Sequence, residues 1–479
     1  MLAKALVPLS LLSSAVTAET VLGVYMFHRH GDRTSKSTPP ANLTDLGYYE
    51  VHTSGDYYRS RYIAADATSK IQGMNTDIVK QSQISVSAPA DTVLQNSATG
   101  FLQGLYPPVG NTLATQTLRN GTNVTTPLNG YQLIPLSLVT SGTGSEDNGW
   151  LQSASGCNAA VTSSNNYFYS TEYNELLSST QEFYDSITPV VNRTFNESQM
   201  SYKNAYLIYD LINVAEINNA SIQSASLITN DSFHQLLTLA NTHEWNLAYN
   251  SSDNTRAIAG MTLAAQVVQF LNTTATNPSK ASKMGIQFGA YASFASFFGL
   301  ANLTAANPDF YGIADYASSM AFELVTNAST AAPSADELSV RFIFHNGTAS
   351  ADSEPQTYPL FGRTDPLVPW TDFVSEMNKF AVGSTEQWCT VCQNSTGTCA
   401  AYASSSSSAP SSGSSTASSS EKGNGLSPAV NGVIGAMVTL AVILGLEALV
   451  LLAGGFRVVR KNAGKGAVTE VAGASQGKA

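Results

Sequence analysis

The sequence predicts an α/β protein: a three-layer sandwich with a mostly parallel sheet, an inserted and mainly helical cap, and a single C-terminal transmembrane helix. Short apolar runs with β-branched and aromatic residues alternate with segments of helical spacing, which is the pattern of an α/β sheet. The middle of the chain, roughly 110–280, is rich in helix-like apolar spacing and is expected to form the cap. A long apolar run near the C-terminus predicts the membrane helix.

Residues 1–18 read as a signal peptide. Lys4 supplies the basic start, 5–12 form the apolar run, and Val16-Thr17-Ala18 is a small-residue cleavage site. The apolar run is too short to span a bilayer. We therefore expect the folded ectodomain to begin at residue 19.

The ectodomain, 19–400, is predicted to alternate strand and helix. Thr44 is an N-cap candidate for the first helix. No internal repeat is evident. The expected elements are strands at 21–27, 83–87, 286–289 and 339–345, a helix at 44–63, and a helix at 290–300 directly behind the third strand.

The C-terminal part is predicted to anchor the chain. Residues 401–427 are Ser-rich and cannot bury apolar surface, so they are expected to be a disordered stalk. Residues 428–455 contain an apolar run of about 20 residues or more, enough for one crossing. Basic residues follow in the tail, 456–479, and place it in the cytosol. This arrangement predicts a type I protein of the secretory pathway, with its ectodomain at the cell surface or in the vacuole or lumen.

Charge and glycosylation patterns agree with that location. Charged residues make up 12% of the chain and the net charge is −11, which argues against nucleic acid as a partner because that needs a clustered basic surface. N-linked glycans are expected on the many Asn-x-Ser/Thr sequons, headed by Asn42, Asn120, Asn123, Asn192, Asn196, Asn219, Asn230, Asn250, Asn272, Asn302, Asn327, Asn346 and Asn394.

All four cysteines lie between the signal peptide and the predicted span: Cys157, Cys389, Cys392 and Cys399. In an oxidising compartment they can form two disulfides, and three pairings are possible. A zinc site is the alternative for Cys389-x-x-Cys392, but no second such pair or nearby histidine pair accompanies it.

The loop after the first predicted strand has the residues that phosphoryl transfer needs. The imidazole of His30 can attack phosphorus, and the guanidinium groups of Arg29 and Arg33 can hold phosphate oxygens. Gly31 allows the backbone to approach a ligand closely. Loops at the carboxyl ends of parallel strands are where α/β sheets bind ligands. A surface loop in which Asp32 pairs with a neighbour is the alternative.

These residues resemble the signature of the histidine acid phosphatase family, which includes the fungal phytases. The similarity implies an α/β domain with a helical cap and hydrolysis of phosphomonoesters through a phosphohistidine on His30, without a metal or other cofactor. Phosphomonoesters or inorganic phosphate are the implied ligands. The stretches that carry the resemblance are 27–34, Leu43 to Gly47, 59–62, Ser97-Ala98, 101–108, 367–373, and Glu386 to Cys389 with Cys392.

Three elements of the family's active members are replaced in this sequence. Val93 stands where the family has a further arginine before Ser97-Ala98. Ala290 and Tyr291 stand where the resemblance implies a His-Asp pair, whose His would clamp the phosphate and whose Asp would protonate the leaving oxygen. His243-Glu244 is the nearest substitute, although its surroundings suggest an exposed helix.

Three functions therefore remain open from the sequence. The first is a phosphomonoester hydrolase acting through His30 with another acid. The second is a catalytically impaired pseudophosphatase, which binds phosphate or serves as a structural cell-surface glycoprotein. The third is a wall or adhesion component, which the Ser-rich stalk would suit. The intact Arg29–Arg33 cluster favours the first two, because a scaffold needs none of these side chains.

Overall fold

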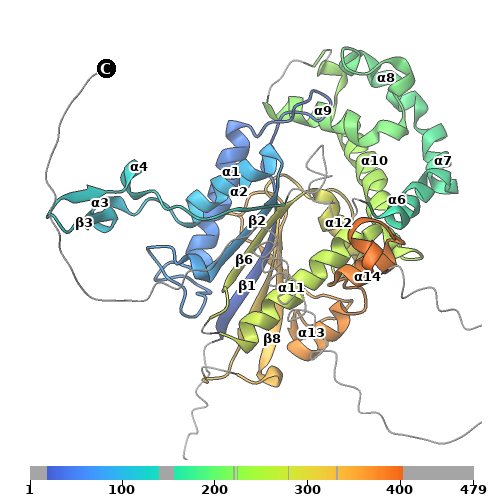
Figure 1. Ribbon diagram of the computed structural model, residues 1–479. Coiled ribbons are helices and arrows are strands. Elements are labelled where there is room, and N and C mark those ends of the chain that lie inside the picture. The colour runs from blue at the N-terminus through green and yellow to red at the C-terminus, as the bar shows by residue number, and fades with distance from the viewer. Residues whose placement is uncertain are drawn as a thin grey trace, which may run out of the picture. The chain divides into compact units, whose positions relative to one another are not determined.

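The computed structural model describes residues 19–139, 156–218, 222–223, 225–278, 280–330 and 333–402, which form a mixed α/β fold (Figure 1). The predicted signal peptide, span and cytoplasmic tail lie outside these residues, as does the stalk beyond Tyr402. Within the described ranges, no helix is long and apolar enough to cross a membrane.

The central sheet has the strand order β10-β8-β7-β1-β6-β2-β5, and β9 pairs with β8. Its half from β5 through β2 and β6 to β1 is parallel, while β7, β8, β9 and β10 join in antiparallel pairs. The strands are β1 (Thr20–Arg29), β2 (Ile84–Pro89), β5 (Ser137–Val139), β6 (Met284–Gly289), β7 (Ser319–Thr326), β8 (Leu338–His345), β9 (Gln356–Tyr358) and β10 (Leu367–Pro369).

Strand β1 lies in the middle of the sheet because both of its faces are apolar. Tyr25 and Phe27 pack into the hydrophobic cluster on one face, and Val24 and Met26 pack into the cluster on the other. Alternate side chains of a strand point to opposite faces, so one short sequence supplies both halves of the core.

Helices cover the two faces of the sheet (Figure 1). On one side α1 (Asp45–Tyr62) packs along α2 (Thr92–Leu105), and both contribute to the cluster that holds Val24. On the other side lie α11 (Ile258–Thr276), α12 (Tyr291–Leu300) and α13 (Trp370–Met377), whose side chains join the cluster that holds Phe27. The result is three layers, as the alternating pattern of the sequence indicates.

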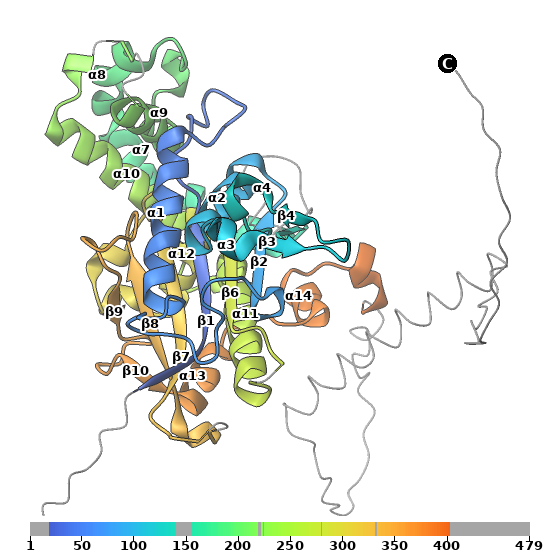
Figure 2. The same ribbon diagram turned by 90° about the vertical axis from the view of Figure 1, so that its left-hand side faces the viewer.

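A helical cap is inserted between β5 and β6 (Figure 2). The cap has its own hydrophobic core, which is rich in tyrosine. Its helices are α6 (Asn158–Asn165), α7 (Thr171–Ser179), α8 (Gln181–Val191), α9 (Ala205–Asn218) and α10 (Asn230–Ala248). These helices occupy less than the range of roughly 110–280 expected from sequence. The start of that range instead holds edge strand β5, short helices α3 (Gly110–Ala114) and α4 (Pro127–Gly130), and a hairpin of β3 (Thr115–Thr117) and β4 (Asn123–Thr125). At its other end, α11 packs against β1.

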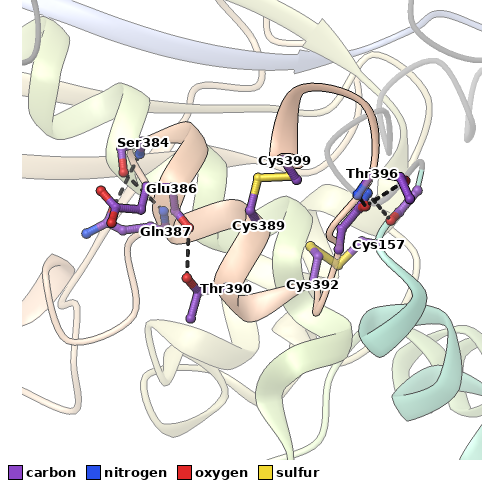
Figure 3. Close-up of a disulfide and its surroundings, with 11 residues drawn as sticks. Cys157, Ser384, Glu386, Gln387, Cys389, Thr390, Cys392, Thr396 and Cys399 are labelled. Atoms are coloured by element: carbon purple, nitrogen blue, oxygen red, sulfur yellow. Dashed lines mark hydrogen bonds between the residues drawn. A yellow bond between two sulfur atoms is a disulfide. The ribbon is translucent and has the colours of Figure 1, made fainter. Parts of the chain in front are cut away.

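Two disulfides fix the C-terminal end of the described chain (Figure 3). Cys157, just before α6, is bonded to Cys392, which follows α14 (Thr385–Val391). Cys389 is bonded to Cys399. Of the three pairings that the sequence left open, the structure has this one, and both sulfur atoms of Cys389-x-x-Cys392 are used.

Candidate functional site

The loop that follows β1 lies at the carboxyl ends of two neighbouring parallel strands. Arg29 is the last residue of β1, and its register partner Gly289 is the last residue of β6. His30 and Ala290 are therefore the next residues along adjacent strands. This edge is where parallel sheets place ligands, and the loop lies at the carboxyl end of a strand, as the sequence indicated.

Close backbone packing against α1 and α2 shapes this loop. A Cβ at Gly31 would lie 2.2 Å from the carbonyl oxygen of Gly47 in α1, so only glycine fits. The Gly31 amide donates to Ser97 Oγ of α2 at 3.2 Å. Asp32 accepts hydrogen bonds from Thr44 Oγ1 at 2.5 Å and from Asn218 Nδ2 at 3.1 Å. Asp32 thus has neutral partners and connects the loop to the start of α1 and to the end of α9.

His30 is fully buried and its ring is oriented by the backbone. Its Nδ1 lies 2.8 Å from the carbonyl oxygen of Gly31. A carbonyl only accepts, so Nδ1 carries the proton in this contact and Nε2 has the lone pair. The ring of Tyr316 packs against the imidazole at a centroid distance of 5.5 Å. The nucleophilic tautomer is therefore set, and aromatic carbon lies beside it.

Arg33 is bonded inside the protein. Its Nη2 lies 2.9 Å from Oδ1 of Asp210 in α9, and both side chains are buried. Tyr206, also in α9, accepts a further hydrogen bond from Arg33 at 3.1 Å. The other oxygen of Asp210 accepts from Ser35 Oγ at 2.8 Å and from the Lys36 amide at 2.9 Å. A carboxylate of the cap is thus the ion-pair partner of Arg33.

Arg29 also has protein partners. Its Nη1 donates to the carbonyl oxygen of Ala314, and its guanidinium lies over the ring of Tyr316 at 4.5 Å and near that of Tyr291 at 5.3 Å. Burial raises the pKa of Tyr316, which keeps that ring neutral. Cation–π contacts of this kind stabilise a buried arginine by about 1–2 kcal/mol. The two arginines of the loop are consequently surrounded by tyrosine rings and a carboxylate.

The three replaced positions lie around this loop. Ala290 is the N-cap residue of α12, is fully buried, and provides no side-chain cap. Tyr291 follows it and donates its hydroxyl to Glu244 Oε2 at 2.7 Å. Val93 is buried in α2, one turn before Ser97, so it faces the same side as the residue that contacts Gly31. Ala290 and Tyr291 thus follow the strand next to β1, and Val93 lies in the helix whose Ser97 contacts Gly31.

His243 and Glu244 are not on an exposed helix, as the sequence suggested, but in the core of the cap. His243 is 6% exposed, and the rings of Tyr167, Phe168, Tyr173 and Tyr202 surround it. Its Nδ1 lies 2.7 Å from Glu244 Oε1. Burial raises the pKa of Glu244, but the hydrogen bonds from His243 and Tyr291 outweigh it and lower the pKa overall. Glu244 is therefore a bonded carboxylate rather than a proton donor.

A mixed α/β domain with a helical cap and an Arg-His-Gly-x-Arg loop after its central strand is the arrangement of a histidine phosphatase. The chain belongs to the histidine phosphatase superfamily (branch 2), whose family model matches residues 37–345. The match confirms the resemblance found in the sequence. It begins at residue 37, so it does not include the loop of Arg29 to Arg33. Membership of this superfamily supports a phosphomonoesterase type of function.

Solved structures show the same fold. The chain resembles the phytase of Klebsiella sp. ASR1, with 11% identity, a TM-score of 0.51, and coverage of 77% of this chain and 97% of that chain. It also resembles the apo form of Hafnia alvei phytase, with 13% identity, a TM-score of 0.50, and coverage of 79% and 99%. No curated protein matches the sequence. At these identities the likeness concerns the fold alone.

Sequence reasoning missed the residues that contact Arg29 and Arg33. α9 has two carboxylates, and Asp210 is the one that lies in the middle of the helix among apolar residues, which was a usable signal of a buried partner for an arginine. Tyr206 and Tyr316 gave no comparable signal, because tyrosines are frequent in the cap and beside β7. Their contacts with Arg29 and Arg33 join segments far apart in the sequence.

Proposed function

We propose that this protein is a catalytically impaired member of its phosphatase family, in which the phosphate-handling loop is closed by the protein's own side chains. The observation that carries this proposal is the buried ion pair between Arg33 and Asp210, at 2.9 Å. Asp210 already pairs with Arg33 Nη2 and Ala314 O with Arg29 Nη1, so a phosphate would have to share the two guanidinium groups with these partners or displace them.

Breaking the pair would be costly. Separating a buried arginine from its carboxylate typically costs about 3–5 kcal/mol, because a charge is left without compensation. Phosphate entry would bring its own negative charge close to Asp210, which has two further hydrogen-bond donors and is held in place. These contacts support a loop that is part of the folded core.

The replaced positions support the same proposal. At Ala290 there is no imidazole to clamp a phosphate oxygen, and each such clamp typically contributes about 10²–10³-fold. The hydroxyl of Tyr291 already donates to Glu244. A missing general acid typically lowers a rate by about 10²–10⁴-fold. Alkyl phosphates, whose leaving oxygen needs a proton, are therefore expected to be very poor substrates.

A phosphatase assay on the full chain tests catalysis. With glycerol phosphate from pH 3 to 7, wild type and His30→Ala should give the same background rate. A rate that His30→Ala abolishes would show that the site turns over despite its closed geometry.

Phosphate binding tests the closure independently of catalysis. Asp210→Asn removes the negative charge beside Arg33, so inorganic phosphate should raise the melting temperature of this variant but not of wild type. Asp185→Asn, which removes an exposed carboxylate of α8, is the control and should behave as wild type. If phosphate raises the melting temperature of wild type as much as that of Asp210→Asn, Asp210 does not close the site.

A second function, slow hydrolysis of activated phosphomonoesters, is favoured by the orientation of His30. Its Nδ1 contact with Gly31 O leaves Nε2 able to attack phosphorus, forming an N–P bond as the P–O bond to the leaving group breaks. A dinitrophenolate can leave as an anion without a donated proton. Hydrolysis of 2,4-dinitrophenyl phosphate that depends on His30, without hydrolysis of glycerol phosphate, would support this second function over complete loss of activity.

A further inference from the structure

A cavity of about 260 Å³ lies between α6, α10 and α12, on the cap side of Tyr291. Apolar groups of Val161, Leu247 and Ala292 line it, and the polar side chains of Arg256 and Glu244 border it. We propose that this cavity binds a small organic anion, with the apolar body of the ligand against these walls and its anionic group on Arg256.

Arg256 is the residue that points to an anion. Its side chain is mostly buried, with 8% of the residue exposed. Nε donates to Ser163 Oγ at 3.2 Å and Nη1 donates to the carbonyl oxygen of Asn246, which fix the guanidinium plane. Among the residues described, Nη2 has no hydrogen bond and no carboxylate lies within ion-pair distance of Arg256.

An anion bound at Nη2 would give the mostly buried Arg256 a charged partner at hydrogen-bond distance, which its described contacts do not provide. Burial lowers the pKa of Arg256, and the more distant charge of Asp253 only partly opposes that effect. The carboxylate of Asp253 is itself bonded to the amide of Thr255. An anion in the cavity would therefore add a direct charged contact to the hydrogen bonds that Arg256 makes with Ser163 and Asn246.

Glu244 keeps its negative charge, but its two oxygens are directed to His243 and Tyr291 and not to Arg256. Oε1 lies 2.7 Å from His243 Nδ1 and Oε2 accepts from Tyr291 at 2.7 Å. Glu244 makes no ion pair with Arg256 within the described chain. The cavity therefore has an available N–H donor of Arg256 at one end. At the other end is the Glu244 carboxylate, which is hydrogen-bonded to His243 and Tyr291.

The volume limits the size of the ligand. Pockets for drug-sized molecules measure about 300–1,000 Å³, so a cavity of about 260 Å³ suits a single ring or a short chain. Apolar walls together with one guanidinium favour a monocarboxylate over a polyphosphate. Arg256 and the apolar walls belong to α6, α10, α12 and the turn before α11 and not to the His30 loop, although Tyr291, which also lines the cavity, lies near Arg29.

Three probes of one shape test the proposal on the full-length protein. Benzoate, benzamide and benzylamine differ in charge but share a ring, and calorimetric titration measures each. We expect benzoate to bind at least ten-fold more tightly than the other two, and Arg256→Gln to remove that preference. Equal binding of benzamide, tighter binding of benzylamine, or no saturable binding of benzoate would overturn the proposal.

A matched pair of surface variants keeps the test decisive if Arg256→Gln fails to fold. Val161 lines the cavity yet is 51% exposed, so Val161→Trp should cover the opening without disturbing the core. Val124, in β4, is 48% exposed and far from the cavity in sequence and fold, so Val124→Trp is the control. Benzoate affinity should fall at least ten-fold in Val161→Trp alone; an unchanged affinity would place benzoate elsewhere.

Discussion

Glu50 contacts the loop after β1 and should make the stability of the protein depend on pH. Its Oε2 accepts a hydrogen bond from the amide of Asp32 at 2.7 Å. Burial raises the pKa of Glu50 from 4.5 to about 7, although the Asp32 hydrogen bond acts in the opposite direction. Between pH 4.5 and about 7, Glu50 keeps its proton in the folded protein but has released it in the unfolded chain. The free energy of unfolding should therefore fall as the pH rises through this window.

Glu50→Gln should remove that part of the pH dependence, because the amide oxygen still accepts from Asp32 but cannot ionise. The pKa change corresponds to at most about 3 kcal/mol between pH 4.5 and 7, and partial solvent exposure of Glu50 reduces it. Urea unfolding across this range measures it. Glu175→Gln, which changes an exposed carboxylate of α7, should retain the wild-type slope. Parallel profiles for wild type and Glu50→Gln would contradict the assignment to Glu50.

At the scale of elements, the start of α1 positions the loop through backbone contact. Thr44 caps α1 by accepting from the Gly47 amide at 3.0 Å and also donates to Asp32. A Cβ at Gly47 would lie 2.0 Å from the carbonyl oxygen of Asp32. The loop and helix are thus in direct backbone contact, which leaves no flexible side chain to yield.

Gly47→Ala should therefore destabilise the protein, although alanine is ordinarily the better helix former by about 1 kcal/mol. We expect a loss of about 3 kcal/mol or more, because backbone must move to admit the methyl group. Tyr49→Ala, at a position of α1 that is 68% exposed, should change stability by no more than about 0.5 kcal/mol. Denaturant unfolding of both variants measures the contrast. Similar values for the two would mean that α1 can shift away from the loop.

The elements around the site were predictable where their patterns are local. The spacing and cap of α1, the apolar runs of β1 and β6, and the position of α12 all follow from neighbouring residues. Strand β7 was not predicted, although it pairs with β1, because Glu323 interrupts its apolar run. That carboxylate is buried against Arg61, Tyr62 and Arg341, and partners so far apart leave no local signal.

The same distinction explains the outcome for the site. Arg29, His30 and Gly31 could be chosen as candidate site residues from the sequence, because all three lie in one short stretch and suit phosphoryl transfer. The ion pair between Asp210 and Arg33 could not be predicted in this way, because Asp210 lies in α9, 177 positions from Arg33 in the sequence numbering, from 33 to 210. Whether a phosphate pocket is open or occupied by side chains depends on such long-range contacts.

On the scale of the whole chain, one disulfide joins the cap to the C-terminal segment. Cys157–Cys392 closes a separation of 235 residues, whereas Cys389–Cys399 closes one of 10. All four half-cystines are buried to a similar extent, between 0% and 4% exposed. The packing cost of replacing either pair with alanine should therefore be similar. Any difference in the free energy of unfolding between the two double variants should then come from the entropy of the unfolded chain.

Removing the long bridge should thus destabilise the fold more than removing the short one. The chain-entropy relation gives a difference of about 3 kcal/mol between separations of 235 and 10 residues. Guanidinium unfolding of Cys157→Ala/Cys392→Ala and of Cys389→Ala/Cys399→Ala measures it directly. An equal loss in both variants would mean that the cap and the C-terminal segment stay close in the unfolded chain. A larger loss for the short bridge would instead show that Cys389–Cys399 supports the packing of α14, on which Cys392 depends.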